Sequence, residues 1–303
     1  MLKSVLAVVI MAGLASCIKD DPDLCVDPRG NVRLTLNLDV RVETRASLDE
    51  FKIDNVHVYA FDASGQYADS DIGGPYIPGQ EYEVFLNLGT GTYNFVVWTN
   101  VGEIYMMNKA TMSGEKINDL QLFMDITAPN CLTSNIPDLL YGSKSAPIVA
   151  KRNNHVEITV IPDIYTINVT VKGLSAATDN YEFSIIDNNS HYNFSNSILG
   201  SQPSFKHVRN AVQSGAEAKS SIKVLHLNAN NTSQLAVKNL TTNNVIFEDD
   251  LIETIIAAYT AANVDFEKIY TYNIELLCDA NMGVSVKVND WTHKDQEGEL
   301  SNK

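Results

Sequence analysis

The sequence has few cysteines and no clustered histidines. Its four cysteines, Cys17, Cys25, Cys131 and Cys278, are too sparse in 303 residues for a disulfide-stapled scaffold. No two histidines have the His-x-x-x-His spacing that would put two zinc ligands on one helix face. We therefore predict no metal site and no other cofactor, and interpret the histidines as surface or satisfied core residues. The six are His57, His155, His191, His207, His226 and His293.

Positive charge is also scarce. The chain carries 22 Lys and Arg against 37 Asp and Glu, a net charge of −15. A protein this acidic is a poor ligand for a phosphate backbone, so no nucleic-acid partner is expected. Anionic lipid surfaces would repel it too, so membrane attachment would have to come from a covalent lipid.

A long apolar run is missing as well. A transmembrane helix needs about 20 consecutive apolar residues, and the run Val5–Leu14 has about half that length before charge sets in. Lys3 precedes this run, and the small residues Ala15 and Ser16 follow it, which is the order of a secretory signal peptide. Residues 1–16 are therefore predicted to be removed after export.

Cys17 stands directly after this signal. Leu14-Ala15-Ser16-Cys17 resembles the lipobox of bacterial lipoproteins. The resemblance implies cleavage between Ser16 and Cys17 and acylation of Cys17, for example with palmitate, and several acyl chains on one residue make a stable anchor. The alternative is an ordinary secretory signal followed by a chance cysteine.

Charged residues follow Cys17 almost at once. Lys19, Asp20 and Asp21 resemble the export signal of Gram-negative lipoproteins that are carried to the cell surface. A plainer interpretation is a charged tether over residues 17–30 that cannot form a core.

The remaining cysteines allow one disulfide. Cys278 ends an alternating run in which Tyr272, Ile274 and Leu276 share its face, so it is predicted to be buried as a small hydrophobic residue. Elimination then pairs Cys25 with Cys131.

Strict alternation of apolar and polar residues dominates the rest. The run Val32–Val42 puts six aliphatic residues on one face and polar residues on the other, which predicts a half-buried strand. Similar runs recur between Gly- and Pro-rich turns, as is typical of antiparallel β-sandwiches. They begin near Val56, Tyr82, Tyr93, Tyr165 and Met282, and the last predicts that Val284, Val286 and Val288 face a core.

Helical patterns are few and short. Residues 249–262 have apolar residues at helical spacing behind an acidic first turn, and residues 136–142 are expected to form one or two turns. The composition changes over residues 141–155, so the sequence predicts two domains, 31–150 and 151–303.

Catalytic and ligand motifs fail when tested. The Ser-x-x-Lys of Ser113 and Lys116 has no Lys-Thr-Gly partner, and Gly89-Thr-Gly91 leads into a strand, as in a hairpin turn. Asp69 and Asp71 precede two glycines but lack the closing Glu of a calcium loop, which favours a solvated loop. The segment 190–197 carries aromatic residues that would suit either glycan contact or an alternating strand.

Several segments together resemble a known family, the fimbrial anchor lipoproteins of type V pili, which are related to the fimbrillins. They are the lipidated terminus CIKDDPDLC, then VHVYAFDASGQY from Val56, GTYNFVVWTN from Gly91, DLLYG from Asp138 and VSVKVNDW from Val284. The resemblance implies a mainly β fold of two tandem transthyretin-like antiparallel β-sandwich domains with a few short helices. It also implies a lipid anchor in the outer membrane, fimbrial stalk subunits as partners, β-strand complementation between subunits, and no catalysis.

Arg45-Ala46 departs from the pattern expected of an anchor. Stalk subunits of these pili are cut after an arginine that follows the first strand, and Arg45 stands at that place. The hypotheses are therefore an anchor or cap that keeps its first strand, a processed stalk or tip subunit, and a lipid-tethered surface module that binds glycans.

Overall fold

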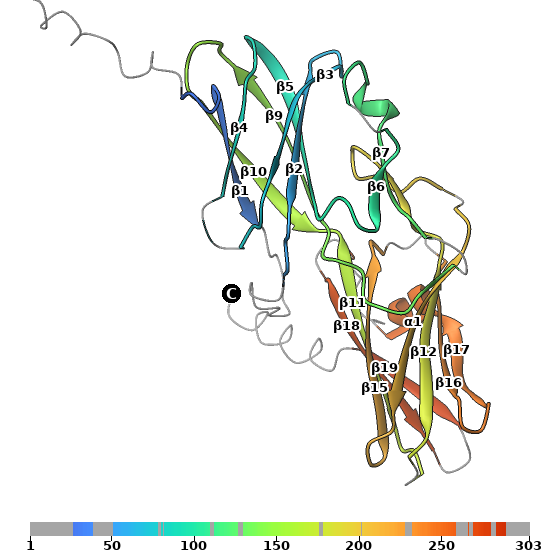
Figure 1. Cartoon of the computed structure of the whole chain (residues 1–303). Helices are drawn as coiled ribbons and strands as arrows, with labels where there is room; N and C mark the ends of the chain where they lie inside the picture. Colours follow the sequence, from blue (N-terminus) through green and yellow to red (C-terminus); the bar gives the residue numbers. More distant parts are fainter. Residues whose placement is uncertain are drawn as a thin grey trace, which may run out of the picture.

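The computed structural model describes residues 27–38, 51–77, 80, 82–109, 112–126, 130–175, 178–200, 202–227, 232–258, 266, 269–279 and 283–288. Over these residues the chain is mainly β, with few short helices, as the sequence predicted. Its strands form four sheets (Figure 1).

A seven-stranded sheet forms the first sandwich. In spatial order its strands are β3 (Tyr67–Gly73), β2 (Val56–Asp62), β5 (Gly91–Thr99), β9 (Leu140–Ile148), β10 (Asn154–Pro162), β1 (Val32–Leu38) and β4 (Glu83–Leu86). The two edges of the sheet approach each other, since the Asn87 N–H after β4 donates to Asp69 Oδ2 of β3 at 2.9 Å. The sheet thus curls around one apolar core that alternating side chains of β1, β2, β4, β5 and β10 fill.

Two expectations for this sandwich were wrong. Asp69 and Asp71 lie within strand β3 and not in a solvated loop. Gly89-Thr-Gly91 is not a hairpin turn, because β4 pairs with β1 whereas β5 pairs with β2 and β9. Both patterns identify turn-forming residues, but the pairing of the flanking strands depends on distant segments.

The domain boundary also needs revision. A division at residue 150 would separate β9 from β10, which pair with each other in one sheet. The next strand, β11 (Ile164–Lys172), pairs with β15 and β18, which belong to the second sandwich. We therefore propose Asp163, the single residue between β10 and β11, as the division.

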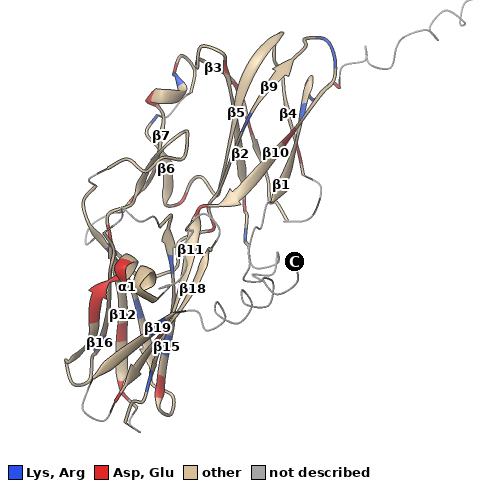
Figure 2. Ribbon diagram, turned by 180° about the vertical axis from the view of Figure 1, so that it is seen from behind, with Lys and Arg blue, Asp and Glu red and all other residues tan. Residues whose placement is uncertain are grey.

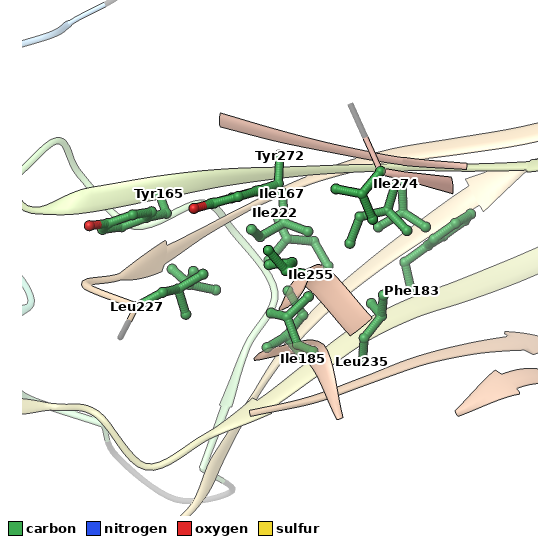
Figure 3. Close-up of a cluster of buried hydrophobic side chains, with 14 of the residues drawn as sticks. Tyr165, Ile167, Phe183, Ile185, Ile222, Leu227, Leu235, Ile255, Tyr272 and Ile274 are labelled. Carbon is green, nitrogen blue, oxygen red and sulfur yellow. The ribbon is translucent and has the colours of Figure 1, made fainter. Parts of the chain in front are cut away.

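Two further sheets make the second sandwich. One contains β15 (Glu217–Leu225), β11, β18 (Thr271–Cys278) and β19 (Val284–Val288). The other contains β17 (Val245–Asp250), β16 (Gln234–Asn239), β12 (Asn180–Asp187), β14 (Phe205–Val212) and β8 (Cys131–Leu132). Helix α1 (Leu251–Ala258) inserts Ile255 between them, among Ile167, Ile185 and Ile222 (Figure 3).

The last strand departs from its prediction. Val288 is buried, but Val286 is 39% exposed although it stands opposite the buried Leu276. Among the described residues β19 is the edge strand of its sheet, so one flank of Val286 has no described strand beside it.

A third apolar cluster joins the sandwiches. It combines Trp98 and Phe61 from the outer face of the first sheet with Ile164 and Leu225 from the second sandwich. A small sheet of β13 (His191–Asn193), β7 (Gln121–Met124) and β6 (Tyr105–Met107) covers it. Tyr192 and Phe194 are each 1% exposed within this cluster.

Each sheet of the two sandwiches contains one parallel pair, although the alternation was interpreted as antiparallel; the small β13-β7-β6 sheet is antiparallel throughout. β1 runs parallel to β10, β11 to β18 and β14 to β8. Side chains alternate in the same way along parallel and antiparallel strands, so the pattern does not report direction.

The helical predictions were met in part. Residues 251–258 form α1, whereas residues 136–139 are not helical and Leu140–Gly142 begin β9. A short 3-10 helix, Ile117–Asp119, was not predicted. No helix in the described part of the chain has the length and apolar character of a membrane span.

Candidate functional site

The first strand is an interior strand of its sheet. β1 pairs with β10 in parallel register, from Val32 opposite Asn154 to Leu38 opposite Val160. On its other side it pairs with β4 in antiparallel register, from Val32 opposite Leu86 to Thr35 opposite Glu83. β1 thus fills a groove between two strands that would otherwise present unpaired backbone groups to each other.

The inner face of β1 is part of the core. Val32 and Leu34 are fully buried and Leu36 is 2% exposed, and they pack with buried residues of β4 and β10. Of the six aliphatic residues predicted on this face, these three are buried, Leu38 is half-buried, and Val40 and Val42 lie outside the described residues.

The outer face of β1 makes polar contacts with the same two strands. Arg33 forms an ion pair with Glu83 of β4. Thr35 Oγ1 lies 2.7 Å from His155 Nε2 of β10, within hydrogen-bond distance. Each neighbouring strand is therefore held by side chains as well as by the backbone ladder.

A buried asparagine fixes the start of the strand. Asn31 Nδ2 donates to the Leu88 carbonyl and Asn31 Oδ1 accepts from the Leu88 N–H, both at 2.7 Å. The Asn31 carbonyl accepts from the Asn154 N–H at 2.9 Å. Gly30 precedes this clamp, and a Cβ there would lie 2.6 Å from the Leu86 carbonyl oxygen, so only glycine fits the close approach.

The residues ahead of the clamp form a compact charged turn. Arg29 Nη2 binds Asp27 Oδ2 at 2.8 Å, and its guanidinium lies 3.9 Å from the centre of the Phe85 ring. The Arg29 hydrogen bond lowers the pKa of the Asp27 carboxyl to about 2, so Asp27 stays ionised and paired. A pocket of about 270 Å³ opens here between the turn, β4 and the start of β10.

Most of the predicted site residues lie outside the described part of the chain. These are Ser16, Cys17, Lys19, Asp20, Asp21, Cys25, Arg45 and Ala46. Cys131 is half-buried in β8, and its disulfide with Cys25 stays a prediction because Cys25 lies outside the described residues. Cys278 is a half-buried free thiol at the end of β18, whereas full burial was expected.

The glycan interpretation of segment 190–197 is wrong for its aromatic residues. Tyr192 and Phe194 are buried in the apolar cluster between the sandwiches and cannot stack on a sugar. The alternating-strand interpretation is correct for His191–Asn193, which form β13.

Buried ionisable groups occur in the second sandwich and at the junction between the sandwiches. Burial raises the pKa of Asp187 to about 6 and, with Arg209 nearby, lowers the pKa of His207 to about 3. Neither ring nitrogen of His207 has a hydrogen-bond partner among the described residues. Asp163 Oδ1 accepts from Asn196 Nδ2 at 3.0 Å, and burial raises the pKa of its carboxyl. No group of three potential metal ligands occurs within the described residues.

Asn31 and Asn154 were missed at the level of sequence. Each stands at the first position of an alternating run, where asparagine is common as a turn residue. That signal was available in the sequence. It does not reveal that each side-chain amide also bonds a backbone group more than 50 residues away in the chain.

The chain matches a known protein family. The model of the fimbrillin-A associated anchor proteins Mfa1 and Mfa2 matches residues 20–297. No curated protein sequence matches the chain.

Solved structures share its fold at low sequence identity. A candidate polysaccharide-binding protein from Bacteroides thetaiotaomicron superposes with a TM-score of 0.70 at 17% identity, over 86% of this chain and 96% of that one. A candidate adhesin from the same organism gives 0.68 at 18% identity, over 88% and 98%. The fimbrial anchor protein Mfa2 of Porphyromonas gingivalis gives 0.62 at 16% identity, over 86% and 98%.

Proposed function

The chain belongs to the family of the fimbrillin-A associated anchor proteins Mfa1 and Mfa2, and on that premise we propose that it is a surface lipoprotein that anchors or caps a fimbrium at the outer membrane. The family is one of structural fimbrial proteins and not of enzymes. The proposal concerns how this chain is attached to the membrane and how it joins its neighbours.

The place of β1 inside its sheet carries the proposal. In strand complementation, one subunit inserts a β-strand into an open groove of another, where backbone hydrogen bonds give affinity and alternate side chains fill pockets. Here the groove between β10 and β4 is occupied by the chain's own β1. A subunit with its groove filled cannot accept a strand there, so this chain would end a polymer. We propose fimbrial stalk subunits as its partners.

Membrane attachment in this proposal comes from the lipid on Cys17. Asp27 follows Cys17 by ten positions, so the chain between them spans at most about 36 Å when extended. Lys19, Asp20 and Asp21 would direct the lipoprotein to the cell surface. β1 follows this segment after the turn that ends at Asn31, and it is therefore part of the covalent link between the lipid and the body of the protein.

Arg45 distinguishes an anchor from a polymer subunit. Cleavage between Arg45 and Ala46 would sever the link to Cys17 and free β1 to leave its groove. We propose that the anchor is not cut there and begins at acylated Cys17. Intact mass and N-terminal sequencing of the native protein test this, with an Arg45→Ala variant as the uncut control. A mature chain that begins at Ala46 would identify a processed stalk or tip subunit instead.

The lipid has a separate test. Cys17→Ala should give a protein that no longer partitions into the detergent phase, because no other lipid anchor is proposed for the chain. Cys278→Ala, which removes a thiol elsewhere in the chain and leaves Cys17 and its motif intact, serves as the matched control. Continued detergent partitioning of the Cys17→Ala protein would refute acylation at this residue.

Partner choice is tested by co-purification. The lipoprotein should be recovered with polymerised stalk subunits from the native membrane, whereas glycan arrays should show no binding. Array binding without any co-purified subunit would favour the lipid-tethered glycan module. The burial of Tyr192 and Phe194 removes the aromatic residues on which that alternative rested.

A further inference from the structure

The loop between β9 and β10 lies at the end of the first sandwich where β1 begins. The Asp27 N–H donates to Asn153 Oδ1 at 3.0 Å, which ties the loop to the turn ahead of β1. Asn154 Nδ2 donates to the carbonyls of Val149 and Asn31, each at 3.0 Å, and links the same two segments. The loop is therefore fixed beside the point where the chain arrives from Cys17.

This loop combines basic and apolar exposure. Lys151 and Arg152 are exposed at its tip, and Val149 beside them is 46% exposed. Asn154 Oδ1 accepts from the Val149 N–H at 2.9 Å, and Thr90 Oγ1 accepts from the Ala150 N–H at 2.9 Å. The loop conformation is thus held from both sides, with its cations and its valine facing outward.

No ion pair within the described part of the chain involves Lys151 or Arg152. Asp27 is paired with Arg29 and Glu83 is paired with Arg33, so these four charges cancel. Lys151 and Arg152 add two positive charges on a chain whose net charge is −15. Figure 2 shows this basic loop in blue at the far end of the first sandwich, while the red acidic segment of β17 and α1 lies in the second sandwich.

We propose that this basic end, defined as Val149, Lys151 and Arg152, docks on the phosphate-bearing head groups of the membrane to which Cys17 is attached. At physiological salt, charges more than about 8 Å from a surface are largely screened, so the acidic second sandwich contributes little repulsion. Cations close to an anionic lipid surface are attracted to it, and an apolar side chain between them enters the head-group region. The repulsion from anionic lipid that the net charge of the whole chain predicts therefore does not apply to this loop.

Docking would orient the protein on the membrane. The strands of the first sandwich would then stand on the surface with the second sandwich directed away from it (Figure 1). The inference rests on the proposed function in one respect: the lipid on Cys17 would hold the protein beside a membrane. Its test uses a protein without that lipid and so does not depend on acylation.

The test uses the chain from residue 17 with Cys17→Ala, so that no acyl chain is present. Sedimentation with phosphatidylcholine vesicles that contain phosphatidylglycerol should recover this protein, and pure phosphatidylcholine vesicles should not. Lys151→Glu with Arg152→Glu should weaken the vesicle affinity by roughly thirty-fold or more, since each cation near an anionic surface contributes about a factor of five. High salt should abolish the binding.

A matched control distinguishes the effect of the two cations at this end from the effect of the net charge of the whole protein. Lys144→Glu with Lys219→Glu makes the same change in net charge at exposed positions in the middle of β9 and on β15. This control should keep the vesicle affinity, and both double variants should keep the melting temperature. Equal loss of affinity in the two double variants, equal binding to pure phosphatidylcholine, or no binding to the anionic vesicles would each overturn the inference. None of these outcomes bears on acylation of Cys17, which the detergent partition test decides.

Discussion

Replacing Leu34 by alanine would measure how firmly β1 is held in its groove. Leu34 is fully buried and stands opposite Val84 of β4 and Val156 of β10. Because strands flank it on both sides, the site cannot collapse freely around a smaller residue. Leu→Ala changes in such cores cost about 2–5 kcal/mol. We expect the free energy of unfolding of the first sandwich to fall by about 3 kcal/mol.

The whole strand contributes more than this single side chain. Val32, Leu34 and Leu36 are buried almost completely, and each is worth about 1.5–3 kcal/mol, which gives about 5–9 kcal/mol together. A typical domain has a total stability of about 5–15 kcal/mol. The first sandwich would therefore not remain folded without β1 unless another strand replaced it.

The assay is urea unfolding followed by tryptophan fluorescence, since Trp98 lies in β5 of the first sandwich. Asn37→Ala is the matched control, because Asn37 belongs to the same strand but is exposed. This control should change the free energy by about 0.5 kcal/mol at most. If Leu34→Ala destabilised the protein no more than Asn37→Ala, β1 would not be a packed strand and the argument for a filled groove would fail.

The remaining predictions concern the second sandwich. The unfolded chain loses the Asp187 proton near pH 4 and the folded chain near pH 6, so stability should fall as the pH rises between these values, and Asp187→Asn should remove this fall in pH-dependent melts. Unfolded His207 takes up its proton near pH 6.5 and folded His207 only near pH 3, so stability should fall as the pH drops through that range. His207→Leu should remove this loss of stability, and a His207→Leu protein whose melting temperature still fell as much at acid pH would contradict the prediction. Val286→Asp should lower the free energy of unfolding by about 1 kcal/mol or less because the Val286 side chain is 39% exposed, whereas Leu276→Asp opposite it should cost several kcal/mol. Equal melting temperatures of the two variants would contradict this difference in burial.

The buried face of a strand was predictable from the sequence because side chains alternate between the two faces with a period of two residues. Val32, Leu34 and Leu36 were placed on a buried face from alternation alone, and they are buried. The same pattern failed at Val286, because burial at a sheet edge depends on whether another strand lies alongside. Alternation identifies the inner face, and the neighbouring strand decides how well that face is covered.

The candidate site was predictable only in part. The run that forms β1 was recognised, but its position between β10 and β4 was not, nor was the Asn31 clamp that holds its start. The cations at Lys151 and Arg152 were visible as a small basic cluster. Their place beside the start of β1 depends on the parallel pairing of strands more than 100 residues apart.

By itself, the sequence determined the class of structure, because side-chain alternation, turn residues and the scarcity of helical patterns are all properties of short segments. It also specified the charge of the chain and the motif at Cys17, which are independent of folding. Only the tertiary structure decided which strands pair, in which direction, and which aromatic residues of segment 190–197 are buried between the sandwiches. Those outcomes depend on contacts between distant segments, and a period of two residues is the same whichever strand lies alongside.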